Sequence, residues 1–168
     1  DNGPNHSRFN IVLVSEGYRQ DATLDEIATF STQCMAFVRA LFWTAPFQNN
    51  WPGINVHRID VRSNESGIDD PMTCSDGTPG SGAQVATYFD SSTCGYGVRR
   101  VPQIDTWLVE DTVRAHVPNY NAILVLINKG LGVGAGGSIA KFSSEPGWEN
   151  VAIHELGHLF GLADEYEC

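Results

Sequence analysis

Runs of apolar residues along the chain predict the strands of a largely buried sheet. Residues 9–14 (FNIVLV) and 122–127 (AILVLI) are apolar without polar alternation, as in strands covered on both faces. Residues 54–61 (INVHRIDV) alternate more clearly between apolar and polar positions. Residues 138–142 (SIAKF) also alternate, which favours an edge strand after the glycine-rich residues 130–137.

Helical spacing predicts three helices between and after these strands. The first covers about residues 23–42, because Thr23 and Glu26 form a capping-box pattern and apolar residues recur at helical spacing behind it. The second lies near residues 104–116, and the last near residues 148–160. Strands that alternate with helices predict an α/β fold with a mostly parallel, twisted sheet and one antiparallel edge strand.

Residues 63–84 are rich in Ser, Gly, Asp and Pro and predict an extended surface insertion, not a linker between domains. Four cysteines, Cys34, Cys74, Cys94 and Cys168, could form two disulfides in any of three pairings. We expect a Cys74–Cys94 bridge because these two residues bracket a Gly/Ser-rich stretch. Free buried thiols are the alternative. Disulfides would place the protein in an oxidising compartment.

The composition and net charge of the chain indicate its size class and disfavour two kinds of binding partner. The chain has 168 residues, which suits one domain, and 42% hydrophobic residues are enough for a core. A formal net charge of -10 disfavours nucleic acid and anionic membrane surfaces, and the apolar runs are too short to span a bilayer. We expect a monomer with neither kind of partner. Since the chain begins at Asp1, we also expect a processed or excised polypeptide.

Residues 154–158 (HELGH), on the last predicted helix, contain side chains that can bind a metal and accept a proton. His154 and His158 are four residues apart, so both imidazoles lie on one helical face and can bind one metal ion. Glu155 follows the first histidine and can accept a proton from a metal-held water as a general base. HExxH occurs in many unrelated proteins, so its context decides its meaning.

The residues after this helix offer a third metal ligand. A catalytic zinc has three protein ligands and one open position. Gly161 can adopt positive φ and end the helix, so that the chain can turn back and bring Asp164 to the metal. Glu165 and Glu167 are alternative ligands, and Asp164 could instead be a solvated residue.

The spacing HExxHxxGxxD resembles the metzincin arrangement with Asp in place of the third His, as in snapalysin-type peptidases. More of the chain resembles the family of IgA-specific metalloendopeptidases, peptidase family M64. This resemblance rests on residues 9–18, 63–67, 128–137 and 154–166. It implies a secreted zinc endopeptidase with a metzincin-like zincin domain that acts on a protein or peptide, without implying immunoglobulin as the substrate.

The resemblance also implies a methionine turn beneath the metal. Met35 and Met72 both precede the HExxH motif and cannot form it. We therefore expect residues 1–168 to be a single catalytic domain that is truncated before its C-terminal subdomain.

Several other residues allow a functional or a structural interpretation. Glu16, just after the first strand, could support the metal or bind substrate, but we expect it to stabilise a turn. Asp69, Asp70 and Asp76 could hold calcium, or could belong to a flexible acidic loop, which we expect. The glycines of residues 132–137 lack the ending of a phosphate-binding loop and would instead let a substrate backbone approach the edge strand.

Three classes of function remain after this reasoning. The first is a zinc endopeptidase in which Glu155 is the general base and His154, His158 and Asp164 hold the metal. The second is a catalytically inactive zincin-like module that binds glycan or protein, and the intact Glu155 argues against it. The third is a domain with a purely structural zinc, which would need a fourth protein ligand.

Overall fold

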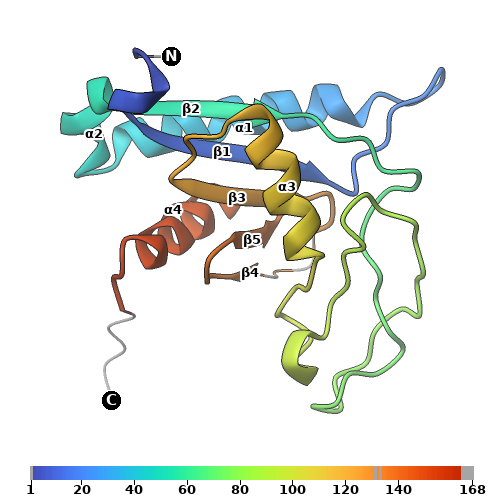
Figure 1. The fold of residues 1–168 in the computed structure, drawn as a ribbon. Helices are drawn as coiled ribbons and strands as arrows, with labels where there is room; N and C mark the ends of the chain where they lie inside the picture. The colour runs from blue at the N-terminus through green and yellow to red at the C-terminus, as the bar shows by residue number, and fades with distance from the viewer. Residues whose placement is uncertain (1, 131, 133, 164–168) are drawn as a thin grey trace.

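The computed structural model describes residues 2–130, 132 and 134–163. Its sheet has five strands in the order β2-β1-β3-β5-β4 (Figure 1). The first four are parallel, and β4 pairs antiparallel with β5 at one edge, so the predicted sheet type is confirmed. The strands are β1 (Phe9–Glu16), β2 (Ile54–Ile59), β3 (Ala122–Ile127), β4 (Gly134–Ala135) and β5 (Ala140–Ser143). The α-helices are α1 (Glu26–Trp43), α2 (Phe47–Asn50), α3 (Thr106–His116) and α4 (Trp148–Leu159).

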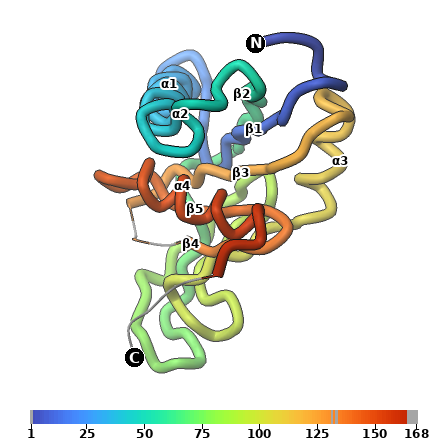
Figure 2. The backbone as a smooth tube through the Cα atoms, turned by 90° about the vertical axis from the view of Figure 1, so that its left-hand side faces the viewer, coloured from blue at the N-terminus to red at the C-terminus, as the bar shows by residue number. Residues whose placement is uncertain are grey.

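Both faces of the sheet are covered, which explains the uninterrupted apolar runs of β1 and β3. Figure 2 shows α1 and α4 on one side of the sheet and α3 on the other. Alternate residues of β1 divide between the two cores: Ile11 and Leu13 pack with α1 and α4, whereas Val12 and Val14 pack with α3. No helix in the described part of the chain is long and apolar enough to cross a membrane.

The edge strand is not the one that the sequence predicts. The alternating pattern predicts residues 138–142 at the edge, but β5 lies between β3 and β4 and runs parallel to β3. Ala140 and Phe142 are buried in one core and Ile139 in the other, so this segment is covered on both faces. The antiparallel edge is formed instead by Gly134–Ala135, within the glycine-rich stretch.

Helix α1 begins later than predicted, and the expected capping box is absent. The Asp25 carboxylate caps the helix by accepting the Ala28 N–H at 3.0 Å. Thr23 does not take this role: its hydroxyl and its N–H donate to the Asp21 carboxylate, at 2.7 and 2.8 Å, in a turn that precedes the helix. Thr23 therefore belongs to a turn closed by Asp21, and the predicted capping box does not form. The other two predicted helices agree with α3 and α4 to within two residues.

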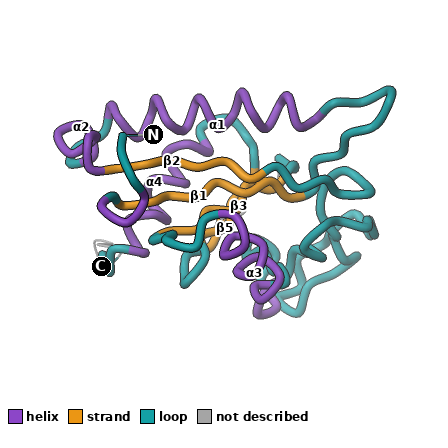
Figure 3. The backbone as a smooth tube through the Cα atoms, turned by 45° about the horizontal axis from the view of Figure 1, so that its top comes forward, coloured by secondary structure: helices purple, strands orange, loops and turns teal. Residues whose placement is uncertain are grey.

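The insertion between β2 and α3 is longer than predicted. It covers residues 60–105 and contains no strand, and its only helical turn is a 3-10 turn at Gly95–Gly97 (Figure 3). The predicted disulfide is present, with Cys74 and Cys94 Cα atoms 5.4 Å apart. Cys34 is buried and forms no disulfide within the described residues.

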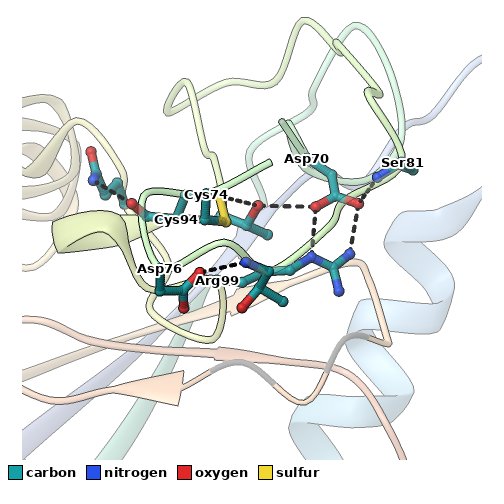
Figure 4. Close-up of a disulfide and its surroundings, with 9 residues drawn as sticks. Asp70, Cys74, Asp76, Ser81, Cys94 and Arg99 are labelled. Atoms are coloured by element: carbon teal, nitrogen blue, oxygen red, sulfur yellow. Dashed lines mark hydrogen bonds and ion pairs between the residues drawn. A yellow bond between two sulfur atoms is a disulfide. The ribbon is translucent and has the colours of Figure 1, made fainter. Parts of the chain in front are cut away.

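An internal ion pair holds the insertion in one conformation. The Asp70 carboxylate, only 2% exposed, receives two bonds from the Arg99 guanidinium, at 2.7 and 3.1 Å. It also accepts the Ser81 N–H at 2.8 Å and the Thr93 hydroxyl at 3.1 Å, beside the disulfide (Figure 4). These bonds, chiefly those from Arg99, lower the pKa of Asp70. Asp70 therefore does not belong to the flexible acidic loop that we expected.

Replacing Asp70 by Asn should destabilise the fold. The Asn amide cannot accept both guanidinium bonds, so we expect the free energy of unfolding at pH 7 to fall by about 2 kcal/mol. Asp90→Asn makes the same chemical change at an exposed residue of the insertion and should change stability by less than about 0.5 kcal/mol. Urea unfolding of both variants and the parent measures the difference.

The same pair predicts a pH dependence. Because the folded-state pKa of Asp70 is lowered, its contribution is present above the ordinary Asp pKa of about 3.9 and is lost as pH falls below it. The stability gap between the parent and Asp70→Asn should therefore shrink under acid conditions. A gap that stays constant down to pH 2 would contradict an ionised, paired Asp70.

Candidate active site

Helix α4 presents its two histidines to solvent because its other face is anchored in the core. Trp148, Ala152 and Leu156 recur every four residues and are buried. The Trp148 indole stacks on Phe142 of β5, with ring centroids 5.6 Å apart, and on Phe37 of α1 at 6.3 Å. This apolar stripe fixes the rotation of the helix about its axis, and hence the direction of the residues between.

The two histidine side chains converge at one point. Their Nε2 atoms lie 3.2 Å apart, and their rings are nearly perpendicular, with centroids 4.7 Å apart. His158 Nδ1 lies 2.9 Å from the Leu162 carbonyl oxygen. Because a carbonyl oxygen only accepts, Nδ1 carries the proton, and in a neutral imidazole Nε2 then offers its lone pair. His158 is thereby held in the tautomer that binds metal through Nε2.

The carbonyl that orients His158 is placed by the predicted glycine stop. Gly161 has a φ of +79°, and its N–H donates to the His158 carbonyl at 2.9 Å. The Leu162 N–H returns to the Gly157 carbonyl at 3.2 Å, which completes a Schellman ending. The prediction that Gly161 ends the helix is confirmed. The same turn brings the Leu162 carbonyl back to the histidine ring.

Glu155 packs against the glycines of the edge strand. It is 8% exposed, and a Cβ atom at Gly136 would lie 2.7 Å from Glu155 Oε2 and 3.3 Å from His158 Cβ. A Cβ atom at Gly134 would lie 3.1 Å from Val151. A Cβ atom at residue 136 would displace the end of the Glu155 side chain, so glycine at this position leaves room for the carboxylate.

The two histidines and Glu155 line a cleft of about 400 Å³. His154, Glu155 and His158 line it from α4, and Gly134 of β4 and Gly136, just after β4, line it from the sheet edge. Sequence reasoning missed its third wall, which consists of Arg100 and Val101 at the end of the insertion. The sequence feature that could have indicated this wall is the consecutive pair Arg99 and Arg100 in a chain with a net charge of -10.

A second, largely apolar pocket of about 490 Å³ also adjoins the histidines. It is lined by Pro46 and Phe47 from the start of α2 and by Phe160 and Leu162 after α4. Glu155 does not line it. Of these two pockets, only the smaller cleft is lined by both the histidine pair and Glu155.

The donor set fits a zinc ion. Zinc–imidazole bonds of about 2.0–2.1 Å at a tetrahedral angle separate the two nitrogen atoms by about 3.3 Å. The observed Nε2–Nε2 distance of 3.2 Å agrees with that separation. Among the described residues, no third His, Cys, Asp or Glu joins them to form a metal-binding group. Asp164, Glu165 and Glu167, the candidate third ligands, lie outside the described residues.

The remaining candidates have structural roles. Glu16 is buried, and its carboxylate accepts the Phe89 N–H and bonds to Thr87 and Ser91, so it anchors the insertion and not merely a turn. Burial outweighs these bonds and raises its pKa. The Asp69 carboxylate accepts the Val85 N–H at 2.6 Å. Asp76 likewise accepts the Thr78 N–H at 2.9 Å, so the acidic residues serve the insertion's own backbone.

Comparison with known proteins identifies the family. A search of curated proteins finds no match to this chain. The sequence does match the family described as IgA Peptidase M64 over residues 1–168, its whole length. The chain therefore belongs to the IgA peptidase M64 family, whose members are peptidases.

Proposed function

We propose that this protein is a secreted, zinc-dependent endopeptidase in which Glu155 is the general base. The observation that carries the proposal is the convergence of two imidazole nitrogens, 3.2 Å apart, in the same cleft as a largely buried carboxylate. His154 and His158 would hold the zinc with Asp164 as the third ligand, in a metzincin-like arrangement. The Cys74–Cys94 disulfide supports an oxidising, extracellular location.

The bound zinc would polarise the scissile carbonyl and lower the pKa of the attacking water. Glu155 would accept the proton of that water and return it to the leaving amine. Packing against Gly136 would limit the orientations of the carboxylate, so the proton acceptor would be positioned before substrate binds. The Leu162 carbonyl would keep the His158 lone pair directed at the metal.

The edge strand would hold the substrate backbone. The Gly134 N–H points away from β5 and donates to the Arg100 carbonyl at 3.2 Å, so the insertion already occupies that end of the edge. Successive residues of a strand point their N–H groups to opposite sides, so a continuation of β4 by one residue would direct the Gly136 N–H outward. A peptide would therefore pair near Gly136, beside Glu155.

Zinc binding should follow the proposed ligand set. We expect one zinc per chain in protein purified without added metal, and severe loss of affinity in His158→Ala and Asp164→Ala. Glu165→Ala, Glu167→Ala and the control His116→Ala on α3 should remain within a small factor of the parent. Competition titration with a chromogenic chelator measures all five. If Glu165→Ala loses zinc and Asp164→Ala keeps it, the third ligand is wrongly assigned.

Glu155→Gln should keep the fold and the zinc and lose hydrolysis. The amide preserves shape but cannot accept the proton, so kcat should fall about 10²–10⁴-fold. Glu149→Gln, in the first turn of the same helix, is the matched control and should cleave at the parental rate. Cleavage of a quenched fluorescent peptide library measures both. Near-parental turnover by zinc-loaded Glu155→Gln refutes the general-base role, and absence of cleavage by the zinc-loaded parent refutes the peptidase proposal.

Gly136→Ala should impair catalysis more than stability. The added Cβ meets the end of the Glu155 side chain, which must move, and a displacement of about 1 Å lowers kcat/KM about 10²-fold. Gly53→Ala is the control, because a Cβ there has no atom within 4 Å. Peptide cleavage and thermal unfolding of both variants test this. Parental activity in Gly136→Ala would show that the close approach does not position the carboxylate.

A further inference from the structure

One wall of the cleft is formed by a segment that carries an arginine. Arg100 and Val101 line the cleft together with His154, Glu155 and His158. Arg100 is exposed. Its guanidinium remains protonated at any physiological pH. The cleft therefore presents a permanent positive charge to whatever binds beside the histidine pair.

The backbone that carries Arg100 is fixed on both sides. Its carbonyl accepts the Gly134 N–H of the edge strand at 3.2 Å. Next to it, the Val101 carbonyl accepts the Gly95 N–H at 2.7 Å, and the Val101 N–H donates to the Val98 carbonyl at 3.0 Å. On the other side, Arg99 is held by the buried Asp70 (Figure 4). Arg100 is thus an exposed side chain on a constrained segment.

Arg99 forms an ion pair with Asp70, but Arg100 forms no ion pair with a described residue. The ion pairs within the described residues use Arg19, Arg58, Arg99 and Arg114, and none of them includes Arg100. Acidic residues are abundant in this chain, with 20 Asp or Glu against 10 Lys or Arg, yet Arg100 pairs with none of those that the structure describes. Its charge is therefore available to a ligand of the cleft.

We propose that Arg100 binds a carboxylate of the peptide substrate and so gives the enzyme a preference for acidic peptides. This inference rests on the proposed peptidase function. Gly134, which anchors Arg100, and Gly136, beside Glu155, are two residues apart, or about 7 Å along an extended chain. The recognised carboxylate consequently lies within about three residues of the scissile bond. It belongs either to an Asp or Glu side chain or to the C-terminus of a short peptide.

Peptide binding to a variant that cannot cleave the peptide tests the role of Arg100 separately from catalysis. The probes are two fluorescent peptide libraries with blocked ends, identical except for a fixed central Glu or Gln, with the other positions randomised over uncharged residues. In zinc-loaded Glu155→Gln, fluorescence anisotropy should show about tenfold tighter binding of the Glu library. A third library, with Gln and a free C-terminal carboxylate, distinguishes the two sources of the charge.

Adding Arg100→Gln should reduce the preference for carboxylate to less than about twofold, and Arg100→Lys should retain part of it. Arg39→Gln, at an exposed residue of α1 that does not line the cleft, should leave it unchanged. Equal or unmeasurable binding of all libraries, or a preference that survives Arg100→Gln, overturns the inference. If the carboxylate preference depends on Arg100 but the parent cleaves no peptide, the peptidase proposal fails and the binding inference stands.

Discussion

The contact between α4 and the edge of the sheet determines the geometry of the whole site. An apolar stripe on the helix, anchored by Trp148, sets its rotation, and the absence of a side chain at Gly136, just after β4, leaves room for the Glu155 carboxylate. These two constraints together leave Glu155 facing the cleft and the histidine pair at its rim. A longer side chain at residue 136 would meet the carboxylate and the His158 ring first, before it disturbed the core.

The insertion matters because it forms the opposite wall of the same cleft. It has no strand or long helix of its own, so its conformation depends on the disulfide, on Asp70 and on contacts to the sheet. Glu16 at the end of β1 supplies one such contact by accepting the Phe89 N–H. The end of the insertion then reaches the edge strand at Gly134. Sheet, insertion and helix thus meet at one place, where the reactive residues lie.

The parts of the structure that could be predicted are those with a local physical cause. Uninterrupted apolar residues identify β1 and β3 as covered strands, and the four-residue spacing of His154 and His158 places both on one helix face. Gly161 ends the helix because its φ is positive, a conformation that glycine adopts readily. The resemblance to the M64 family, stated from short motifs, is confirmed over the whole chain.

What the sequence could not predict depends on contacts between distant residues. Pairing with β3 on one side and with β4 on the other makes β5 an interior strand, although its pattern alternates. The ion pair of Asp70 joins residues 29 positions apart, and no local pattern indicates it. Arg100 reaches the cleft for the same reason, since its place follows from how the insertion closes on the edge strand.

The central claim is that the histidine pair holds a catalytic zinc with an open position. X-ray absorption at the zinc edge of the purified protein tests it most directly. We expect a shell of two imidazole nitrogens at about 2.0–2.1 Å, completed by oxygen atoms of a carboxylate and water, and we expect His158→Ala to lose it. Zinc bound by four protein ligands, or a spectrum without imidazole scattering that His158→Ala leaves unchanged, would contradict it.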